Sequence, residues 1–210
     1  MQITLTPVQE TQLLNYVGLL DKWNRSFNLT AVKDPAQMVT RHLLDSLSVF
    51  PYLCPLTQDI LDVGTGAGLP GIPLAISCTT KKITLLDNNY KKQVFVGQAI
   101  QSLGLKNAQA VQCNVKAYEP SQKFSTIITR AFADPAKMIA LCGHLLRPQG
   151  RFLAMRGKVS EEPPALPEGY HIEQIIILSV PGLNEQRHLA VIKREIEQEI
   201  EQEGKESHGV

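Results

Sequence analysis

The first fifty residues carry hydrophobic side chains at the three- and four-residue spacing of amphipathic helices. Two capping sequences, Thr-Pro-Val-Gln from Thr6 and Asp-Pro-Ala-Gln from Asp34, each place proline at the first helical position, where its missing N–H costs nothing. A hydrophobic stripe follows each capping sequence. We therefore predict two helices, the first ending near residues 22–24 and the second near Leu47, with a connecting loop over residues 24–30.

After residue 58, short apolar runs alternate with helical stretches, as in an α/β protein. The apolar runs have the length of strands buried inside a sheet. The last two runs are joined by residues 181–186 alone, and a connection without a crossover helix requires an antiparallel pair. The pattern predicts a doubly wound, mostly parallel seven-stranded sheet with one antiparallel strand. The predicted strands are Ile60–Val63, Lys82–Asp87, Ala110–Cys113, Ser125–Thr129, Arg151–Met155, His171–Val180 and Arg187–Lys193, and the helices among them are Gly71–Ser77, Asn89–Leu103 and Asp134–Leu146.

These elements divide the chain into three predicted parts. Residues 1–55 are expected to form an N-terminal helical cap packed on the core, residues 56–194 the core, and residues 195–210 an acidic, flexible tail. The tail holds six glutamates and one lysine, so the rest of the chain has 20 basic and 14 acidic residues and a net charge of +6, against +1 for the whole chain. A mildly basic body is compatible with a nucleic-acid partner, although many enzymes without such a partner are as basic.

The cysteines stand at positions 54, 78, 113 and 142 and never form a Cys-x-x-Cys pair, which argues against a zinc site or a disulfide framework. Neither a secretory signal nor an apolar run of membrane-spanning length is visible. With 43 % hydrophobic and 20 % charged residues, the composition is ordinary for a soluble domain. We therefore expect a cytoplasmic monomer that binds neither metal nor membrane.

Four glycines follow the first predicted strand, at positions 64, 66, 68 and 71. A glycine-dense turn between a strand and a helix lets the backbone take left-handed angles and lets a nucleotide-like ligand approach closely. The stretch 66–71 matches the dinucleotide pattern G-x-G-x-x-G, which is a weak signal alone. The match starts two residues late for a dinucleotide turn, and Pro70 removes an N–H group where a pyrophosphate would need one.

A second pattern, acid-x-Gly-x-Gly-x-Gly, begins at Asp62 and resembles the first motif of class I S-adenosylmethionine-dependent methyltransferases. Asp87, at the end of the next predicted strand, stands where these enzymes place an acid that accepts hydrogen bonds from ribose hydroxyls. An ionised carboxylate suits a neutral diol because it offers two acceptor oxygens. The resemblance implies S-adenosylmethionine as the cofactor. The competing interpretation is that both acids are ordinary strand-end residues.

The residues after the fourth predicted strand narrow the chemistry of the substrate. Residues 129–132 read Thr-Arg-Ala-Phe, not the Asn/Asp-Pro-Pro-Tyr/Phe motif usual in methylation of exocyclic amines. No cysteine lies in a recognisable setting for attack on cytosine. A ring nitrogen with a free lone pair, such as guanine N7, attacks the methyl group directly, so positioning can carry catalysis without a general base. Accordingly, no catalytic residue is identified.

Five motifs together resemble the bacterial 16S ribosomal RNA guanine-N7 methyltransferases once called glucose-inhibited division protein B. The first two lie outside the generic methyltransferase core, and the resemblance extends from about residue 7 to residue 194. The motifs are Lys-Trp-Asn-Arg-Ser-Phe-Asn-Leu-Thr at 22–30, Arg-His-Leu-Leu-Asp-Ser at 41–46, Asp-Val-Gly-Thr-Gly-Ala-Gly-Leu-Pro-Gly-Ile-Pro at 62–73, Arg-Ala-Phe at 130–132 and Arg-His at 187–188.

The resemblance implies methyl transfer from S-adenosylmethionine to N7 of guanine 527 in 16S ribosomal RNA, either free or in a small-subunit particle. Where the family often has an acid, this chain has Lys116, a harmless change if the contact is made by the backbone. Arg130 suits the methionine carboxylate or an RNA phosphate because a guanidinium is always charged; the alternative is a surface cation. The predicted cofactor-binding residues are Gly64, Leu69, Val115, Lys116 and Arg130, by position in the family, with Gly66 and Asp87.

Two other functions stay open, namely a small-molecule methyltransferase in which the N-terminal helices form a lid, and a cofactor-sensing RNA-binding assembly factor without turnover. Several further residues are assigned either a structural role or an RNA-binding role. Tyr16, Trp23 and Phe27 could stack on bases, but at helical spacing we expect them in the core. We expect His42 to be a buried structural histidine and leave His188 undecided. Four cations form either an RNA-facing patch or a solvated surface: Lys22, Arg25, Lys33 and Arg41.

Overall fold

The computed structural model describes residues 3–53, 55, 57–130, 134–157 and 165–195 of the chain. Apart from Glu195, the predicted flexible tail lies outside these residues. Within the described part, no helix is long and apolar enough to cross a membrane.

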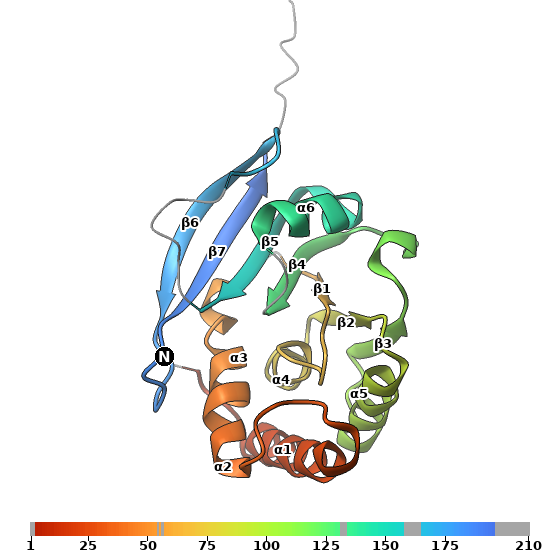
Figure 1. Ribbon diagram of the computed structural model, residues 1–210, viewed down its shortest axis with the longest axis vertical. Coiled ribbons are helices and arrows are strands. Elements are labelled where there is room, and N and C mark those ends of the chain that lie inside the picture. Colours follow the sequence, from red (N-terminus) through yellow and green to blue (C-terminus); the bar gives the residue numbers. More distant parts are fainter. Residues whose placement is uncertain (1–2, 54, 56, 131–133, 158–164, 196–210) are drawn as a thin grey trace, which may run out of the picture.

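One seven-stranded sheet runs through the molecule in the order β3-β2-β1-β4-β5-β7-β6 (Figure 1). The first five strands are mutually parallel, and β7 pairs antiparallel with both of its neighbours. The predicted α/β fold with a single antiparallel strand is therefore confirmed. The strands are β1 (Asp59–Val63), β2 (Lys82–Asp87), β3 (Ala108–Gln112), β4 (Phe124–Arg130), β5 (Leu146–Arg156), β6 (Tyr170–Leu178) and β7 (Arg187–Arg194).

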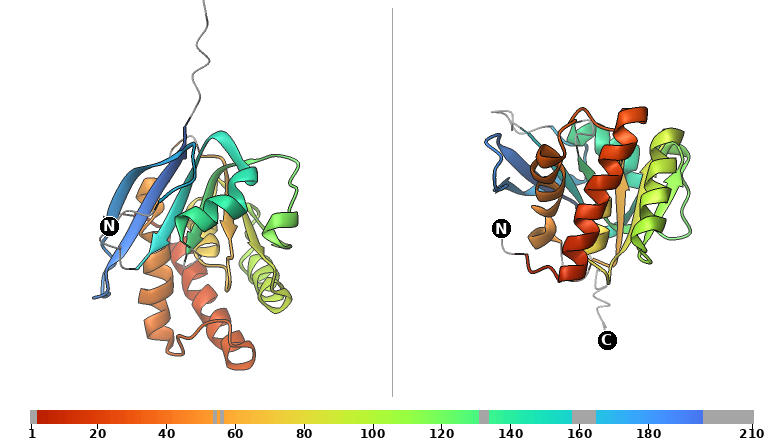
Figure 2. Two further views of the ribbon diagram at one scale, coloured as in Figure 1. Left: turned by 45° about the horizontal axis from the view of Figure 1, so that its top comes forward. Right: turned by 90° about the horizontal axis from the view of Figure 1, so that it is seen from below.

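Helices cover both faces of the sheet because the inner strands bury side chains on both sides. In β1, for example, Ile60 belongs to one hydrophobic cluster and Leu61 to the other. The first cluster also holds the N-terminal helices, α4 (Gly71–Ser77) and α5 (Tyr90–Leu103), and the second holds α6 (Pro135–Cys142). Figure 2 shows α1 between the α2–α3 segment and α5, across one face of the sheet.

Helix α1 (Pro7–Phe27) begins with the predicted capping box, in which Gln9 N–H donates to Thr6 and the Gln9 side chain accepts from Thr6 N–H. It ends about one turn later than predicted, at Phe27, and its C-cap residue Asn28 has a left-handed φ of +49°. The prediction was wrong here because residues 24–30 lack a hydrophobic period. The helix nevertheless continues, since the Phe27 ring packs on Trp23 with centroids 5.1 Å apart.

The second predicted helix is continuous but not uniform. It comprises α2 (Pro35–Met38), a π-helical stretch (Val39–Leu44) and α3 (Asp45–Leu47). A short 3-10 turn follows at Phe50–Tyr52. The wider π turn was not predicted, because hydrophobic spacing over so few residues does not separate a π turn from an α turn.

The boundary between α6 and β5 was also predicted wrongly. The helix ends at Cys142, a 3-10 turn covers Gly143–Leu145, and the strand already starts at Leu146. Leu145 and Leu146 are both buried, so they continue the apolar pattern. A short apolar run has the same appearance in a buried strand as in a helix, which explains the error.

Candidate functional site

The glycine turn joins β1 to α4 in left-handed backbone. The φ values of Gly64, Gly66 and Gly68 are +69°, +59° and +87°, and residues with a Cβ are strained in this region. The N–H groups of Gly64 and Thr65 both donate to Leu86 O, at 2.8 and 3.1 Å. The end of β2 therefore fixes the start of the turn.

Asp62 supports the turn from inside the protein. Its Oδ2 accepts from Thr65 Oγ1 at 2.6 Å and from Gly71 N at 2.8 Å, while Oδ1 has no partner among the described residues. The side chain is fully buried, and burial raises the pKa of the Asp62 carboxyl to about 6. Asp62 is thus not an ordinary strand-end acid: it ties the turn to the first residue of α4.

Asp87 lies beside the same turn, at the end of β2. Its Oδ2 accepts from Gly66 N and its Oδ1 from Asn89 N, both at 2.9 Å. A carboxylate offers about four lone-pair sites, so both oxygens retain acceptor capacity. Asp87 therefore braces the glycine turn and can still accept hydrogen bonds from a ligand.

Two cavities flank the turn at the carboxyl ends of the parallel strands, where open α/β sheets bind ligands. The first, of about 480 Å³, lies between the turn, the N-terminal helices and β7, and the second, of about 240 Å³, lies over the ends of β1, β2 and β3. Gly64 lines both. The predicted cofactor residues Gly66, Leu69 and Arg130 line the first cavity, and Asp87, Val115 and Lys116 line the second.

The structure thus brings together all seven residues of the predicted cofactor site. Val115 and Lys116 belong to a 3-10 turn (Val115–Ala117) that is capped by the Asn114 side chain, which accepts from Lys116 N at 3.0 Å. An acid, Asp87, lines the second cavity, and charged side chains, among them Arg130, line the first. Which atoms of S-adenosylmethionine each residue contacts stays a prediction.

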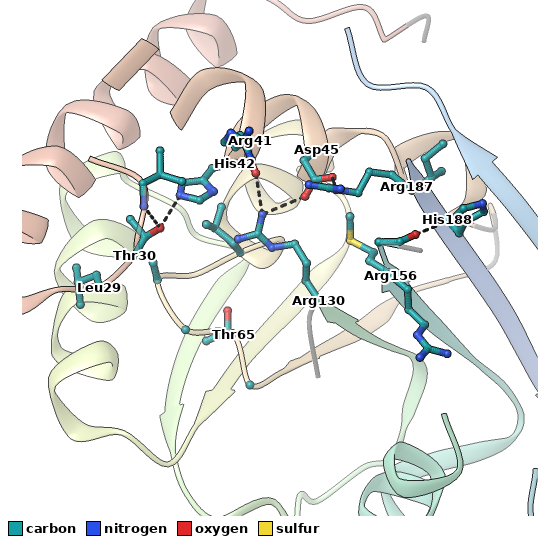
Figure 3. A pocket seen from close by; sticks show the side chains of 18 residues that line it. Leu29, Thr30, Arg41, His42, Asp45, Thr65, Arg130, Arg156, Arg187 and His188 are labelled. Carbon is teal, nitrogen blue, oxygen red and sulfur yellow. Dashed lines mark hydrogen bonds and ion pairs between the residues drawn. The ribbon is translucent and has the colours of Figure 1, made fainter. Parts of the chain in front are cut away.

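Three charged side chains cross the first cavity in a row (Figure 3). Asp45 Oδ2 accepts from Arg130 Nη1 and Asp45 Oδ1 accepts from Arg187 Nε, both at 3.1 Å. Arg130 Nη1 also donates to the backbone oxygen of Arg41, a residue of the π-helical stretch, at 3.1 Å. The Arg130 side chain is only 20 % exposed. The alternative that Arg130 is merely a surface cation is therefore wrong.

Asp45 lies within the motif at 41–46, and the sequence alone assigns it no role. A signal was present, since Asp45 falls within the hydrophobic stripe of the predicted second helix. A buried acid nearly always needs a charged or hydrogen-bonding partner. The identity of its partners was hidden, because they lie on strands remote in the sequence.

Two histidines also line the first cavity. His42 is buried on the apolar stripe, as predicted, and its Nε2 lies 2.9 Å from Thr30 Oγ1, while Nδ1 has no partner in the described part of the chain. Burial, with a smaller effect of the Arg130 charge, lowers the pKa of His42 to about 4, so the imidazole is neutral at pH 7. His188 Nδ1 lies 2.7 Å from Gly157 O, at the end of β5.

The aromatic residues of α1 have three different environments. Tyr16 is fully buried and its hydroxyl donates to Ala67 O in the glycine turn at 2.7 Å. Trp23 packs on Phe95 of α5, with centroids 5.7 Å apart. Phe27 is 45 % exposed, so the expectation of a core position is confirmed for Tyr16 and wrong for Phe27. In the last turn Asn24 is still buried, so the buried face of the helix ends only after that residue.

Of the four cations left undecided, Arg41 alone lines the first cavity, and it pairs with Glu185 at 2.6 Å. Arg25 is exposed and pairs with Asp21 one turn earlier. Lys22 and Lys33 are exposed. The structure therefore separates Arg41 from the other three, and whether those face RNA stays undecided.

Comparison with known proteins gave one family model, described as "GidB: rRNA small subunit methyltransferase G", which matches residues 9–190. Curated relatives named "Ribosomal RNA small subunit methyltransferase G" include that of Shewanella amazonensis, 49 % identical over 86 % of this chain and 87 % of the relative. The relative from Klebsiella pneumoniae is 48 % identical over 91 % and 92 % of the two chains.

Solved structures share the fold at low sequence identity. An S-adenosylmethionine-dependent methyltransferase from Aquifex aeolicus superposes with a TM-score of 0.56 at 17 % identity, covering 85 % of this chain and 97 % of the other. TrmN from Thermus thermophilus gives a TM-score of 0.53 at 14 % identity, over 71 % and 48 % of the two chains.

Proposed function

Because the chain belongs to the rRNA small subunit methyltransferase G family, we propose that it transfers a methyl group from S-adenosylmethionine to N7 of a guanine in 16S ribosomal RNA, guanine 527 by resemblance. The fold is that of class I methyltransferases, and S-adenosylmethionine is the cofactor of the fold and the family. The protein acts as a monomer in the cytoplasm, on free RNA or on a small-subunit particle.

The observation that carries the proposal is the pair of cavities that meet at Gly64. In the second cavity Asp87 would accept hydrogen bonds from the ribose hydroxyls of the cofactor, and Val115 and Lys116 would lie beside the base of the cofactor. Lys116 lies on an exposed turn that is capped by the Asn114 side chain. A cofactor contact made by the backbone of this residue is not affected by having lysine where the family often has an acid. In the first cavity Gly64 and Gly66 would admit the methionine portion, and Arg130 would bind its carboxylate.

Bound S-adenosylmethionine supplies an electrophilic methyl group on a sulfonium sulfur. The protein's task is then to hold the guanine lone pair in line with that group, and orientation of this kind can lower a barrier by up to about 7–11 kcal/mol. Three features favour such a mechanism. His42 is a weak base because its pKa is lowered to about 4, Asp62 faces the turn rather than the cavity, and the cavity wall is partly apolar, with Leu69, Met155 and Leu178.

The direct test is transfer of labelled methyl groups to 16S ribosomal RNA from cells that lack the modification, offered both as naked RNA and as small-subunit particles. We expect one labelled site, which chemical cleavage at N7-methylguanine then maps. Failure on both substrates with intact cofactor binding contradicts the proposal and favours a small-molecule substrate. Stoichiometric RNA binding without release of S-adenosylhomocysteine favours an assembly factor.

A further inference from the structure

Asp45 holds two arginines that come from opposite sides of the first cavity. Its side chain is only 5 % exposed, and its two oxygens are divided between Arg130 at the end of β4 and Arg187 at the start of β7. Both guanidinium groups are largely buried, with side chains 20 % and 22 % exposed. A buried carboxylate shared in this way fixes the orientation of both planar groups.

The hydrogen-bonding capacity of the arginines is only partly used. A guanidinium has five N–H donors, and Arg187 uses one for Asp45 and one for Gln186 O. Arg130 uses two, for Asp45 and Arg41 O. Each therefore keeps three donors that have no partner among the described residues, and both line the first cavity.

The cavity also carries uncompensated positive charge. Arg41 is neutralised by Glu185, whereas Arg130 and Arg187 share the single charge of Asp45. Arg156, at the end of β5, lines the same cavity and has no ion pair within the described residues. Within the described part of the chain, Arg130 and Arg187 therefore carry one positive charge beyond that of Asp45, whereas the Arg156 guanidinium points away from them (Figure 3). A charged, partly desolvated site of this kind strongly favours an anion.

We propose that Arg187, positioned by Asp45, binds a phosphate of the RNA backbone next to the target guanine. The inference rests on the proposed function, in which Arg130 binds the carboxylate of the cofactor. A single acid then orients the cofactor-binding arginine with one oxygen and the phosphate-binding arginine with the other. Asp45 touches neither ligand and is a positioning residue.

This role reverses the effect on RNA use that charge alone predicts for the removal of Asp45. Removing an acid from an RNA-binding cavity strengthens attraction to phosphate if the acid contributes only its charge. If Asp45 positions Arg187, its removal weakens RNA use instead, because the guanidinium group loses its fixed orientation. A displacement of about 1 Å can cost on the order of 10²-fold in rate.

The experiment compares Asp45→Asn with Glu185→Gln, which removes the acid paired with Arg41, a residue of the first cavity, without touching Arg130 or Arg187. Steady-state methylation of unmodified 16S ribosomal RNA is measured with correctly folded protein. We expect kcat/KM for RNA to fall by about 10- to 100-fold in Asp45→Asn, chiefly through KM, and to stay equal or rise in Glu185→Gln. An equal or higher value in Asp45→Asn overturns the inference.

A double-mutant cycle separates positioning from general destabilisation. In the Arg187→Gln background, Asp45→Asn should have little further effect on KM for RNA, because the arginine that it positions is gone. Arg187→Gln should also reduce the slope of log affinity against log salt by about one while leaving cofactor affinity unchanged. Additive effects on KM, or an unchanged slope, overturn the inference.

Two outcomes keep the test decisive. If Asp45→Asn does not fold, Arg187→Lys replaces it: the charge remains but the planar fork is lost, and we expect a fall of about tenfold in kcat/KM; wild-type activity overturns the inference. If the wild-type protein transfers no methyl group to RNA, the proposed function fails and the inference with it. An active wild type with additive variants overturns the inference alone.

Discussion

Gly64 and Gly104 share a left-handed backbone, with φ values of +69° and +66°, but only Gly64 lines the two cavities. A valine is strained at either position by roughly 1–2 kcal/mol. We predict that both Gly64→Val and Gly104→Val lower the free energy of unfolding by this amount, and that only Gly64→Val abolishes S-adenosylmethionine binding. Calorimetric titration of both folded variants checks this. Undiminished affinity in Gly64→Val means that the proposed cofactor site is wrong.

His42 makes stability depend on pH. Its pKa is lowered from 6.5 to about 4 in the folded protein, so between these values the unfolded chain binds a proton that the folded chain lacks. Stability is therefore complete above pH 6.5 and declines as the pH falls towards 4. At pH 5 the loss is about 2 kcal/mol, since one pKa unit corresponds to about 1.4 kcal/mol.

Urea unfolding at pH 7 and pH 5 tests this effect against a His42→Asn variant. The wild type should lose about 2 kcal/mol more than the variant. Asp62 acts in the opposite direction, because its pKa is raised to about 6, but it is present in both proteins and cancels in the difference. Parallel losses would falsify the assignment of a depressed pKa to His42.

Single residues could be predicted where a local pattern defined them. The glycine pattern and the acid at the end of the next strand identify the turn and Asp87 because these residues belong to neighbouring strands. The link between Asp45 and Arg187 spans 142 positions in the sequence. No local pattern carries that information, since the contact exists only once β7 lies beside β5.

At the scale of elements, α1 is joined to the glycine turn by one buried hydrogen bond. Tyr16 Oη donates to Ala67 O at 2.7 Å, and burial raises the pKa of Tyr16 well above its usual value, so the hydroxyl stays protonated. We predict that Tyr16→Phe costs about 1–3 kcal/mol, the penalty for a buried carbonyl left without a donor, and weakens cofactor binding.

Tyr52→Phe is the matched control for this substitution. The Tyr52 side chain packs against the same hydrophobic cluster, and its hydroxyl has no hydrogen bond within the residues that the structure describes. Denaturant unfolding and cofactor titration of both variants should separate them clearly. Equal stabilities and affinities for the two variants would mean that the bond to Ala67 contributes nothing.

Strands and α-helices could be predicted over most of the described chain, but the π turn could not, and element ends could be predicted only where a local signal marks them. The limits of α4 and β2 agree with the predicted ones because a glycine turn and an acidic strand end mark them. The end of α1 depends on Trp23 and Phe27 packing together, and the end of α6 depends on β5 pairing with β4. Both causes are tertiary contacts, and the secondary-structure propensities of the residues carry no information about such contacts.

For the whole molecule, charge distribution predicts an effect of the acidic C-terminal residues on RNA binding. Removing residues 196–210 takes away five glutamates and one lysine and raises the net charge from +1 to +5, while keeping the hydrogen bond from Glu195 N to Gly169 O. We predict tighter RNA binding by the shortened chain at low salt, with the difference vanishing as salt increases.

Affinity for 16S ribosomal RNA across a series of salt concentrations measures this effect. A full-length variant in which the same five glutamates are replaced by glutamine separates charge from chain length and should behave like the shortened chain. Equal affinity of all three proteins at low salt would contradict the prediction. The division of the chain at residue 55 stays a prediction.

The position of β7 in the sheet has a consequence for protein synthesis. Among the strands of the described residues it leaves the ribosome after all the others, yet it lies between β5 and β6 and carries Arg187 and His188 into the first cavity. Chains fold as they emerge from the N-terminal side, so a nascent chain can form the glycine turn long before Asp45 meets its second arginine. An enzyme proposed to modify ribosomal RNA is thus assembled on a ribosome with its phosphate site incomplete until β7 is translated.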